Sequence, residues 1–188
     1  MNGFIRVIGG KWRGRKLPVL DSNGLRPTTD RVKETLFNWL MPVLQNARCL
    51  DCYSGSGSLG FETLSRGAQH TVLLEKNPTV TNQLKKNSQL LKTDNIEIHL
   101  TDTLNWLNRP AIQKFDLVFI DPPFHHNLAE ATVALLENNG WLKAGAYIYI
   151  ETELQNNKLF QHIPSNWHLH REKIAGQVYS RLFIRADA

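Results

Sequence analysis

Short apolar segments alternate with segments of helical pattern from residue 47 to residue 153, and this alternation constrains the fold more than any other feature of the chain. The apolar segments predict strands at residues 47–53, 70–76, 95–102, 115–121 and 146–153. The segments between them predict helices at residues 57–67, 78–91, 103–107 and 128–139. Strands that alternate with helices indicate an α/β fold with a doubly wound, mostly parallel sheet.

The two ends of the chain depart from this alternation. Residues 4–8 and 15–19 predict two strands joined by a glycine-rich turn, which is a small β-hairpin. Residues 167–185 predict a second pair of strands, which would form an antiparallel hairpin at one edge of the sheet. We therefore expect an N-terminal hairpin appendage, residues 1–24, on one larger domain, residues 25–188.

The positive charge is concentrated in the predicted N-terminal hairpin. The chain has 22 Lys and Arg against 17 Asp and Glu, and its first twenty residues hold five of the cations and no acid. A localised basic arm that includes an aromatic ring favours binding to a polyanion such as nucleic acid, although a solvated tail has the same composition. The candidate RNA-binding residues are Arg6, Lys11, Trp12, Arg13, Arg15 and Lys16, together with Arg26 before the next helix.

The two cysteines, Cys49 and Cys52, form a C-x-x-C pair at the end of a predicted strand. A zinc site would need a second pair, which the sequence lacks, and a redox pair normally opens a helix. We interpret both as packing residues and expect no metal site. Unpaired thiols fit a reducing compartment. No apolar run has the length of a membrane span and no signal core is present, so we expect a cytoplasmic protein.

A glycine-rich loop follows the strand at residues 47–53. Gly55, Gly57 and Gly60 form the pattern G-x-G-x-x-G between a strand and a helix, where glycine allows a sharp turn and close approach to a ligand. Glu75 lies twenty residues after Gly55, at the end of the next strand, where a carboxylate can accept both hydroxyls of a ribose. This loop suits either a dinucleotide or S-adenosylmethionine.

Two acidic residues favour S-adenosylmethionine over a dinucleotide. Asp51 lies just before the loop, where it would repel a pyrophosphate but attract the cationic amino-acid group of S-adenosylmethionine. Asp102 ends the third strand, where it can accept a hydrogen bond from an adenine amino group. A structural turn flanked by surface acids is the alternative. The candidate cofactor-binding residues are Asp51, Gly55, Gly57, Gly60, Glu75 and Asp102.

The segment DPPF, residues 121–124, ends the most apolar short run of the chain. The Asp121 carboxylate and the Pro122 carbonyl can accept hydrogen bonds from an exocyclic amino group and so aim its lone pair at a methyl donor. Pro123 fixes the turn and has no competing N–H, and Phe124 offers a face on which a base can stack. A Pro-Pro strand terminator followed by a buried Phe is the alternative. The candidate catalytic residues are Asp121, Pro122, Pro123 and Phe124.

Three segments together resemble the RsmD family of bacterial 16S ribosomal RNA guanine-N2 methyltransferases. They are the loop LDCYSGSGSLGFETLSRGA, the turn DPPF, and the N-terminal RVIGGKWRGRKLPV with LRPTTDRVKETLFNWL. The first two are shared with many amino-group methyltransferases, and the N-terminal block is the more distinctive. The loop departs from the family in reading DCYSGSG where relatives commonly resemble DLFAGSG, a change that keeps the glycines.

The resemblance implies a class I methyltransferase fold, which is Rossmann-like, and S-adenosylmethionine as the donor. It implies methylation of the N2 amino group of one guanine in 16S ribosomal RNA, within an assembled or partly assembled small ribosomal subunit. We expect a monomer. From the residues alone, methylation of adenine or cytosine in DNA, a nicotinamide-dependent oxidoreductase and a catalytically silent nucleic-acid-binding module remain open. The sequence assigns no role to His125 and His126 and does not identify the nucleotide.

Overall fold

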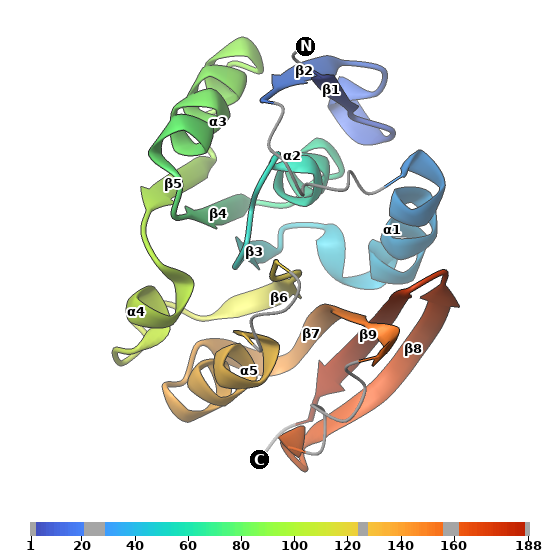
Figure 1. The fold of residues 1–188 in the computed structure, drawn as a ribbon, viewed down its shortest axis with the longest axis vertical. Helices are drawn as coiled ribbons and strands as arrows, with labels where there is room; N and C mark the ends of the chain where they lie inside the picture. The colour runs from blue at the N-terminus through green and yellow to red at the C-terminus, as the bar shows by residue number, and fades with distance from the viewer. Residues whose placement is uncertain (1–2, 21–28, 124–127, 156–161, 187–188) are drawn as a thin grey trace.

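The computed structural model describes residues 3–20, 29–123, 128–155 and 162–186, and it contains a central seven-stranded sheet (Figure 1). The strands lie in the order β5-β4-β3-β6-β7-β9-β8. Their bounds are β3 (Arg48–Asp51), β4 (His70–Glu75), β5 (Ile96–Leu100), β6 (Phe115–Ile120), β7 (Leu142–Glu153), β8 (Trp167–Ala175) and β9 (Val178–Arg185). The five strands from β5 to β7 are parallel, and β9 and β8 are antiparallel, as the sequence predicts.

The strand order reverses direction between β3 and β6, which are adjacent in the sheet. From β3 the chain proceeds outward through β4 and β5, whereas from β6 it proceeds to the other edge through β7. Doubly wound sheets bind their ligands at such a switch point, outside the carboxyl ends of the strands. The topology therefore predicts a ligand site at the segments that follow β3 and β6.

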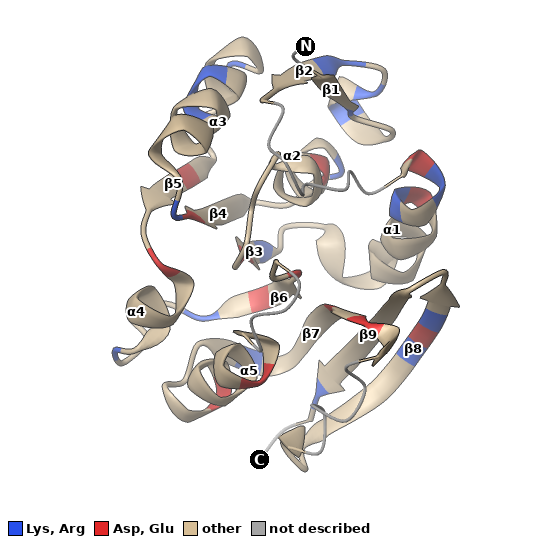
Figure 2. Ribbon diagram, viewed as in Figure 1, with Lys and Arg blue, Asp and Glu red and all other residues tan. Residues whose placement is uncertain are grey.

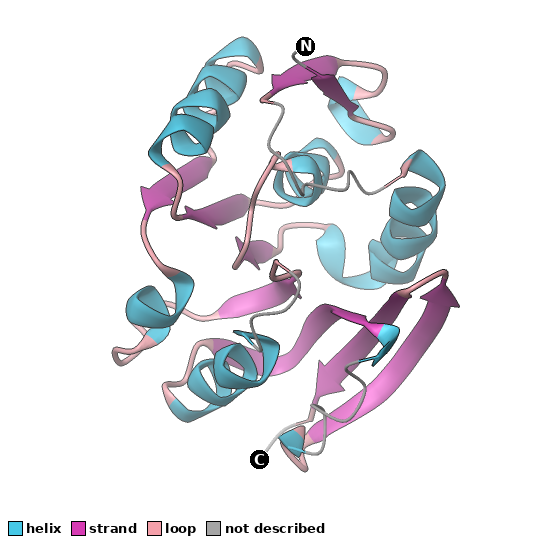
Figure 3. Cartoon of the chain, in the orientation of Figure 1, coloured by secondary structure: helices cyan, strands magenta, loops and turns pink. Residues whose placement is uncertain are grey.

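Helices cover both faces of the sheet (Figure 3). Their bounds are α1 (Asp30–Leu44), α2 (Ser58–Ser65), α3 (Pro78–Leu90), α4 (Thr103–Leu107) and α5 (Leu128–Asn138). Helices α1, α2 and α3 lie on one side and α4 and α5 on the other (Figure 1). Alternate strand residues supply the two cores, since Phe119 packs with α1 while Ile120 packs with α5. None of the helices in the described part of the chain is long and apolar enough to cross a membrane.

Helices α1 and α3 begin where side chains cap their first turns. The Thr29 hydroxyl accepts a hydrogen bond from the backbone N–H of Val32 at 3.3 Å at the start of α1. The Asn77 side chain accepts from the N–H of Thr79 at 2.9 Å, and Pro78 occupies the first position of α3, where its missing N–H costs nothing. These local signals explain why α1 and α3 start where they do.

The N-terminal residues form the predicted hairpin, from β1 (Gly3–Arg6) and β2 (Lys16–Val19), with a short 3₁₀ helix, η1 (Gly10–Trp12), in the connection. Ile5 and Leu17 are buried in one cluster with Phe61 of α2. The hairpin therefore shares a core with the larger domain. The predicted boundary between residues 24 and 25 lies outside the described residues.

Strand β1 ends two residues earlier than the sequence predicts, and a buried carboxylate explains the difference. The backbone N–H groups of Ile8 and Gly9 donate to the Glu62 carboxylate of α2 at 3.1 and 2.8 Å instead of continuing as a regular strand. Lys33 of α1 lies 3.2 Å from the same carboxylate and is itself buried. Glu62 thus joins the hairpin, α1 and α2 at one point.

Candidate active site at the carboxyl edge of the sheet

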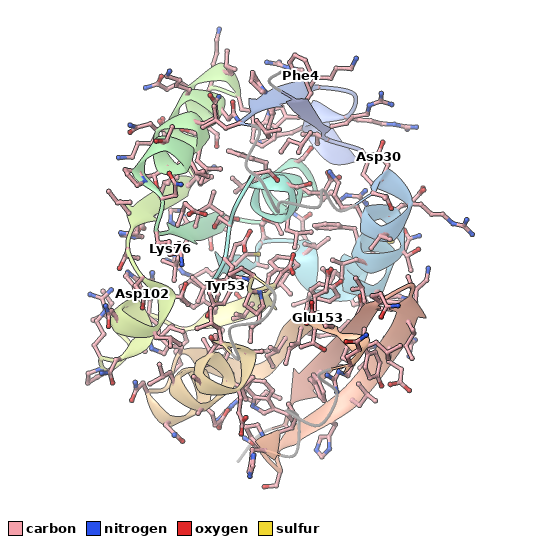
Figure 4. All side chains as sticks on the ribbon, viewed as in Figure 1. Phe4, Asp30, Tyr53, Lys76, Asp102 and Glu153 are labelled. Atoms are coloured by element: carbon pink, nitrogen blue, oxygen red, sulfur yellow. The ribbon has the colours of Figure 1, made fainter. Side chains whose placement is uncertain are left out.

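Four acidic residues that the sequence singles out lie at one edge of the sheet. Asp51 and Glu75 end β3 and β4, Asp121 directly follows β6, and Asp102 lies two residues after the end of β5. Since these four strands are parallel, all four acids lie at their carboxyl ends. In Figure 4, the labels Tyr53, Lys76 and Asp102 mark the segments that leave β3, β4 and β5 at this edge.

Asp51 is a buried carboxylate with an unsatisfied oxygen. Its side chain is 2% exposed, and Oδ1 has no hydrogen-bond partner among the described residues. Burial raises the pKa of Asp51 to about 7, against a smaller lowering by the backbone N–H of Tyr53, and the charge of Glu75 raises it further. An unpaired buried carboxylate is costly unless a cation or donor reaches it. Asp51 therefore fits the ammonium group of an amino-acid moiety.

The glycine loop between β3 and α2 is held by backbone hydrogen bonds. The N–H of Ser54 donates to the carbonyl of Leu74 at 3.1 Å, and the N–H of Gly57 donates to the carbonyl of Ser54 at 2.7 Å. Gly55 and Gly57 have φ values of 50° and 77°, in the left-handed region that favours glycine. A Cβ on Gly60 would lie 2.3 Å from a methyl carbon of Leu73. The third glycine thus allows α2 to pack closely on β4.

Replacing Gly57 by Ala is expected to destabilise the protein more than replacing Gly145 by Ala. Both glycines have positive φ, but a Cβ on Gly57 would lie 2.6 Å from the Phe61 ring, whereas nothing lies within 4 Å at Gly145. The overpacking should cost about 1–3 kcal/mol beyond the shared backbone strain. Urea denaturation of both variants gives the comparison. Equal losses of unfolding free energy would contradict the steric account of the loop.

Glu75 is held in place by two backbone donors. Its Oε2 accepts from the N–H of Gly55 at 3.0 Å, and its Oε1 accepts from the N–H of Asn77 at 2.8 Å. Each carboxylate oxygen has a second lone pair for a further donor. The arrangement fixes Glu75 beside the glycine loop and leaves acceptors suitable for ribose hydroxyls.

Asp102 also has a structural role, as the N-cap of α4, which the sequence did not predict. Its Oδ1 accepts from the backbone N–H of Asn105 at 3.0 Å and so caps α4. The side chain is exposed. Capping of α4 leaves other lone pairs of the Asp102 carboxylate free to accept from an adenine amino group. The predicted contact of Asp102 with the cofactor therefore stays a prediction.

The Asp121 segment leaves β6 next to Asp51. Burial raises the pKa of Asp121 well above its usual range, and the negative charges of Glu151 and Asp51 raise it further. Pro122 is buried and Pro123 is exposed. Of the other residues considered in this segment, Phe124, His125 and His126 lie outside the described residues.

Glu151 and Tyr149 lie beside the candidate site, although the sequence did not single them out. Both lie on β7, beside β6, and the Tyr149 hydroxyl is 3.0 Å from Oε2 of Glu151. Burial raises the pKa of the Glu151 carboxyl, against a smaller lowering by the Tyr149 hydrogen bond. The one signal in the sequence is that Glu151 is an acidic residue directly after the apolar run AYIYI, two positions after Tyr149.

The cysteines have the predicted packing role. Both are buried and unbonded, and they belong to different cores, Cys49 with α1 and α2 and Cys52 with α4 and α5. Because they point to opposite faces of the sheet, they cannot form a disulfide without moving the strand.

The basic residues of the hairpin are exposed, and Figure 2 shows Lys and Arg gathered on it. Arg15 also donates to the carbonyl of Leu90 at 3.1 Å, so it helps to hold the hairpin on α3. Trp12 is only partly exposed and packs against both the α1–α2 core and the hairpin core, with the Lys11 ammonium 4.2 Å from its ring centre. The structure thus shows packing for Trp12. The predicted RNA contacts stay predictions. Of the candidate RNA-binding residues, Arg26 lies outside the described residues, and the exposed cations are Arg6, Lys11, Arg13, Arg15 and Lys16.

Comparison with known proteins adds to this geometry. The family model described as Conserved hypothetical protein 95 matches residues 5–184. The chain is 53% identical over 184 residues to the protein named ribosomal RNA small subunit methyltransferase D of Escherichia coli strain K12, covering 98% of this chain and 91% of the relative. The protein of the same name from Haemophilus influenzae strain Rd is 54% identical over 184 residues, covering 96% and 94%.

A solved structure has the same fold over nearly the whole chain. It is described as putative methyltransferase yhhF from Escherichia coli and has a TM-score of 0.91 at 50% sequence identity, covering 98% of this chain and 99% of the other. The doubly wound sheet is therefore the class I methyltransferase fold.

Proposed function

Because the chain belongs to the RsmD family of ribosomal RNA methyltransferases, which the model Conserved hypothetical protein 95 describes, we propose that it methylates the N2 amino group of a guanine in 16S ribosomal RNA. The methyl donor in this proposal is S-adenosylmethionine. The substrate is an assembled or partly assembled small ribosomal subunit, and the enzyme acts as a cytoplasmic monomer. Relatives named small subunit methyltransferases support the RNA substrate, and the acids at the sheet edge support the donor.

The donor site comprises the loop and the ends of β3, β4 and β5. Bound S-adenosylmethionine supplies an electrophilic methyl group on a positively charged sulfur. The unsatisfied Oδ1 of Asp51 would bind its ammonium group, and Glu75 would accept hydrogen bonds from its ribose hydroxyls. Gly55 and Gly57 leave room for its close approach, and Asp102 accepts from its adenine amino group.

Asp121 and Pro122 bind the amino group of the target base. The N2 lone pair of guanine is delocalised into the ring, so the amino group is a poor nucleophile. Two acceptors, the Asp121 carboxylate and the Pro122 carbonyl, favour a more tetrahedral nitrogen whose lone pair is directed at the methyl group.

Asp121 also accepts the proton that N2 releases as it gains the methyl group. A carboxylate whose pKa is raised by burial and by the neighbouring charges of Glu151 and Asp51 is a better proton acceptor than an exposed one. Transient protonation of Asp121 therefore balances the transfer, and the proton then passes to solvent.

The observation that carries the proposal is the pair of acids at the switch point. Asp51 and Asp121 follow adjacent strands, and the charge of one acts on the pKa of the other. In this arrangement, the donor's cationic group and the target amino group are bound side by side. A pyrophosphate would instead meet the uncompensated carboxylate of Asp51.

Nucleoside mass spectrometry tests the proposal. The protein is incubated with S-adenosylmethionine bearing a deuterated methyl group and with small ribosomal subunits, protein-free 16S ribosomal RNA or duplex DNA. We expect labelled N2-methylguanosine from the subunits. Label in N6-methyladenine or N4-methylcytosine instead, or label only in DNA, would overturn the proposed target.

The basic hairpin should contribute phosphate contacts to RNA binding. Replacing Arg13, Arg15 and Lys16 together by Ala is expected to weaken binding and to lower the slope of log K against log salt by up to about three. Fluorescence anisotropy with labelled 16S ribosomal RNA measures this slope. The matched control replaces Lys114, Arg171 and Lys173, which lie elsewhere on the surface. An unchanged slope in the hairpin variant, with an unchanged melting temperature, would support the solvated-tail interpretation.

A further inference from the structure

Glu151 lies beside Asp121 because of the register of β6 and β7. Ile120 pairs with Ile150 in this parallel pair of strands, so Asp121 and Glu151 occupy the next position on each chain. Neighbouring strands lie about 4.8 Å apart. The charge of Glu151 is the largest neighbouring charge acting on Asp121.

Within the described residues, the Glu151 carboxylate is held at one oxygen. The Tyr149 hydroxyl lies 3.0 Å from Glu151 Oε2 and 3.0 Å from the hydroxyl of Ser180 on β9. Tyr149 is buried, and burial raises its pKa well above the usual range, so it stays a hydrogen donor. No donor among the described residues reaches the other oxygen, Oε1.

Among the described residues, the charges that act on Asp121 are negative. The carboxyls of Glu151 and Asp51 both act on Asp121, and Glu75 acts on Asp51 from β4. Within the described part of the chain, no cation is among the groups that shift the pKa of Asp121 or Glu151. A ligand that satisfies both carboxylates must therefore bring adjacent hydrogen donors.

Guanine has this arrangement of donors at its Watson–Crick edge. Its ring N1–H lies directly next to the N2 amino group. Adenine and cytosine have a ring nitrogen with a lone pair, N1 or N3, next to their amino groups. Enzymes that act on an unstacked base read it through hydrogen bonds to this edge. A second carboxylate beside Asp121 thus matches guanine and repels the other two bases.

We propose, on the basis of the function proposed above, that Glu151 is a specificity-determining residue whose Oε1 accepts the N1–H of the target guanine while Asp121 accepts from N2. Tyr149 is a positioning residue that orients the Glu151 carboxylate. Asp121 and Glu151 together select guanine. A ring nitrogen with a lone pair beside the amino group would give Glu151 no hydrogen donor and would repel its negative charge.

The test changes the Watson–Crick edge of the substrate base. Once the methylated guanine is mapped, 16S ribosomal RNA is ligated from fragments with guanine or 2-aminopurine at that position and assembled into small subunits. 2-Aminopurine keeps the exocyclic amino group, but it lacks O6 and has a lone pair at N1 in place of N1–H. We expect the wild-type enzyme to prefer guanine by about 100-fold in kcat/KM, which is the loss of one hydrogen bond to a charged group.

The Glu151→Gln variant should lose most of this preference. The carboxamide can donate to the lone pair of 2-aminopurine as well as accept from N1–H, so the guanine preference is expected to fall by about tenfold or more. Tyr149→Phe should reduce the preference to an intermediate value. Glu172→Gln, which removes a carboxylate on exposed β8, is the matched control and should keep the wild-type ratio.

The outcomes separate this inference from the proposed function. If the wild-type enzyme does not methylate the guanine substrate, the proposed function fails. If it methylates guanine and 2-aminopurine equally well, or if Glu151→Gln keeps the full preference while binding S-adenosylhomocysteine normally, the part assigned to Glu151 is wrong. The wild-type comparison needs no variant, so the inference remains testable even if Glu151→Gln does not fold.

Discussion

Replacing Asp121 by Ala is expected to lower methyl transfer to small ribosomal subunits by about 10²–10⁴-fold, the usual contribution of a residue that handles the proton of a reacting group. The variant lacks both the acceptor that aligns the amino group and the group that takes up its proton. Binding of S-adenosylhomocysteine should remain within a few-fold of the wild-type value, because the donor contacts lie at Asp51, Glu75 and the glycine loop. Single-turnover transfer and isothermal titration calorimetry measure the two effects.

A carboxylate at the other end of the same strand provides the control. Asp116 of β6 accepts from the backbone N–H of Arg48 at 2.8 Å and forms an ion pair with Lys143. Asp116→Asn is expected to cost stability but to leave the transfer rate of the folded enzyme near the wild-type rate. Transfer by Asp121→Ala within about threefold of wild type would exclude Asp121 as the proton acceptor.

Replacing Asp51 by Asn is expected to weaken S-adenosylhomocysteine binding by about 10–100-fold, the contribution of a hydrogen bond to a charged group. The same change should stabilise the ligand-free protein at pH 8, because it removes a buried carboxylate whose Oδ1 has no partner among the described residues. Chemical denaturation and calorimetry test the two opposite effects. A loss of stability without a loss of affinity for S-adenosylhomocysteine would indicate that Asp51 has a structural role instead.

The raised pKa of Asp51 also predicts a pH dependence. The folded protein has this pKa at about 7, against an ordinary value of 3.8. The contribution of Asp51 to stability is therefore fully present below pH 3.8 and is lost as the pH rises through about 7. A ligand ammonium group favours the ionised form, so S-adenosylhomocysteine should bind with proton release at pH 6 and with less release at pH 8.

Calorimetry in buffers of different ionisation enthalpy counts the released protons. The Asp51→Asn variant is the control and should release fewer protons at pH 6 than the wild type. A titration with NAD in the same cell separates the donors. Tight binding of NAD without binding of S-adenosylhomocysteine would favour the nicotinamide-dependent alternative.

Much of the fold follows from local sequence signals. The strands and helices from β3 to α5 were predicted within a few residues because each strand is a short apolar run and each helix begins or ends at a recognisable signal, such as Pro78 or Gly67. Strand β7 begins four residues before the predicted segment. The sequence did not predict this start because the first residues of the strand, around Gly145, are not uniformly apolar. The early end of β1 depends on Glu62, which lies more than fifty residues away. No local pattern contains that contact.

The position of the candidate site could be predicted where acidic residues coincide with strand ends. Asp51, Glu75 and Asp121 were identified because parallel strands bring their carboxyl ends to one edge. Glu151 was missed because its closeness to Asp121 depends on the pairing of Ile120 with Ile150, which only the folded sheet provides. Buried Lys33 was missed for the same reason, since its partner Glu62 belongs to another helix.

A structure with S-adenosylhomocysteine bound would test the central claim most directly. We predict that the ligand's amino group lies within hydrogen-bonding distance of Oδ1 of Asp51 and that its sulfur faces the Asp121–Pro123 segment. A ligand bound elsewhere, or a sulfur directed away from Asp121, would contradict the proposal that donor and target base meet between the ends of β3 and β6.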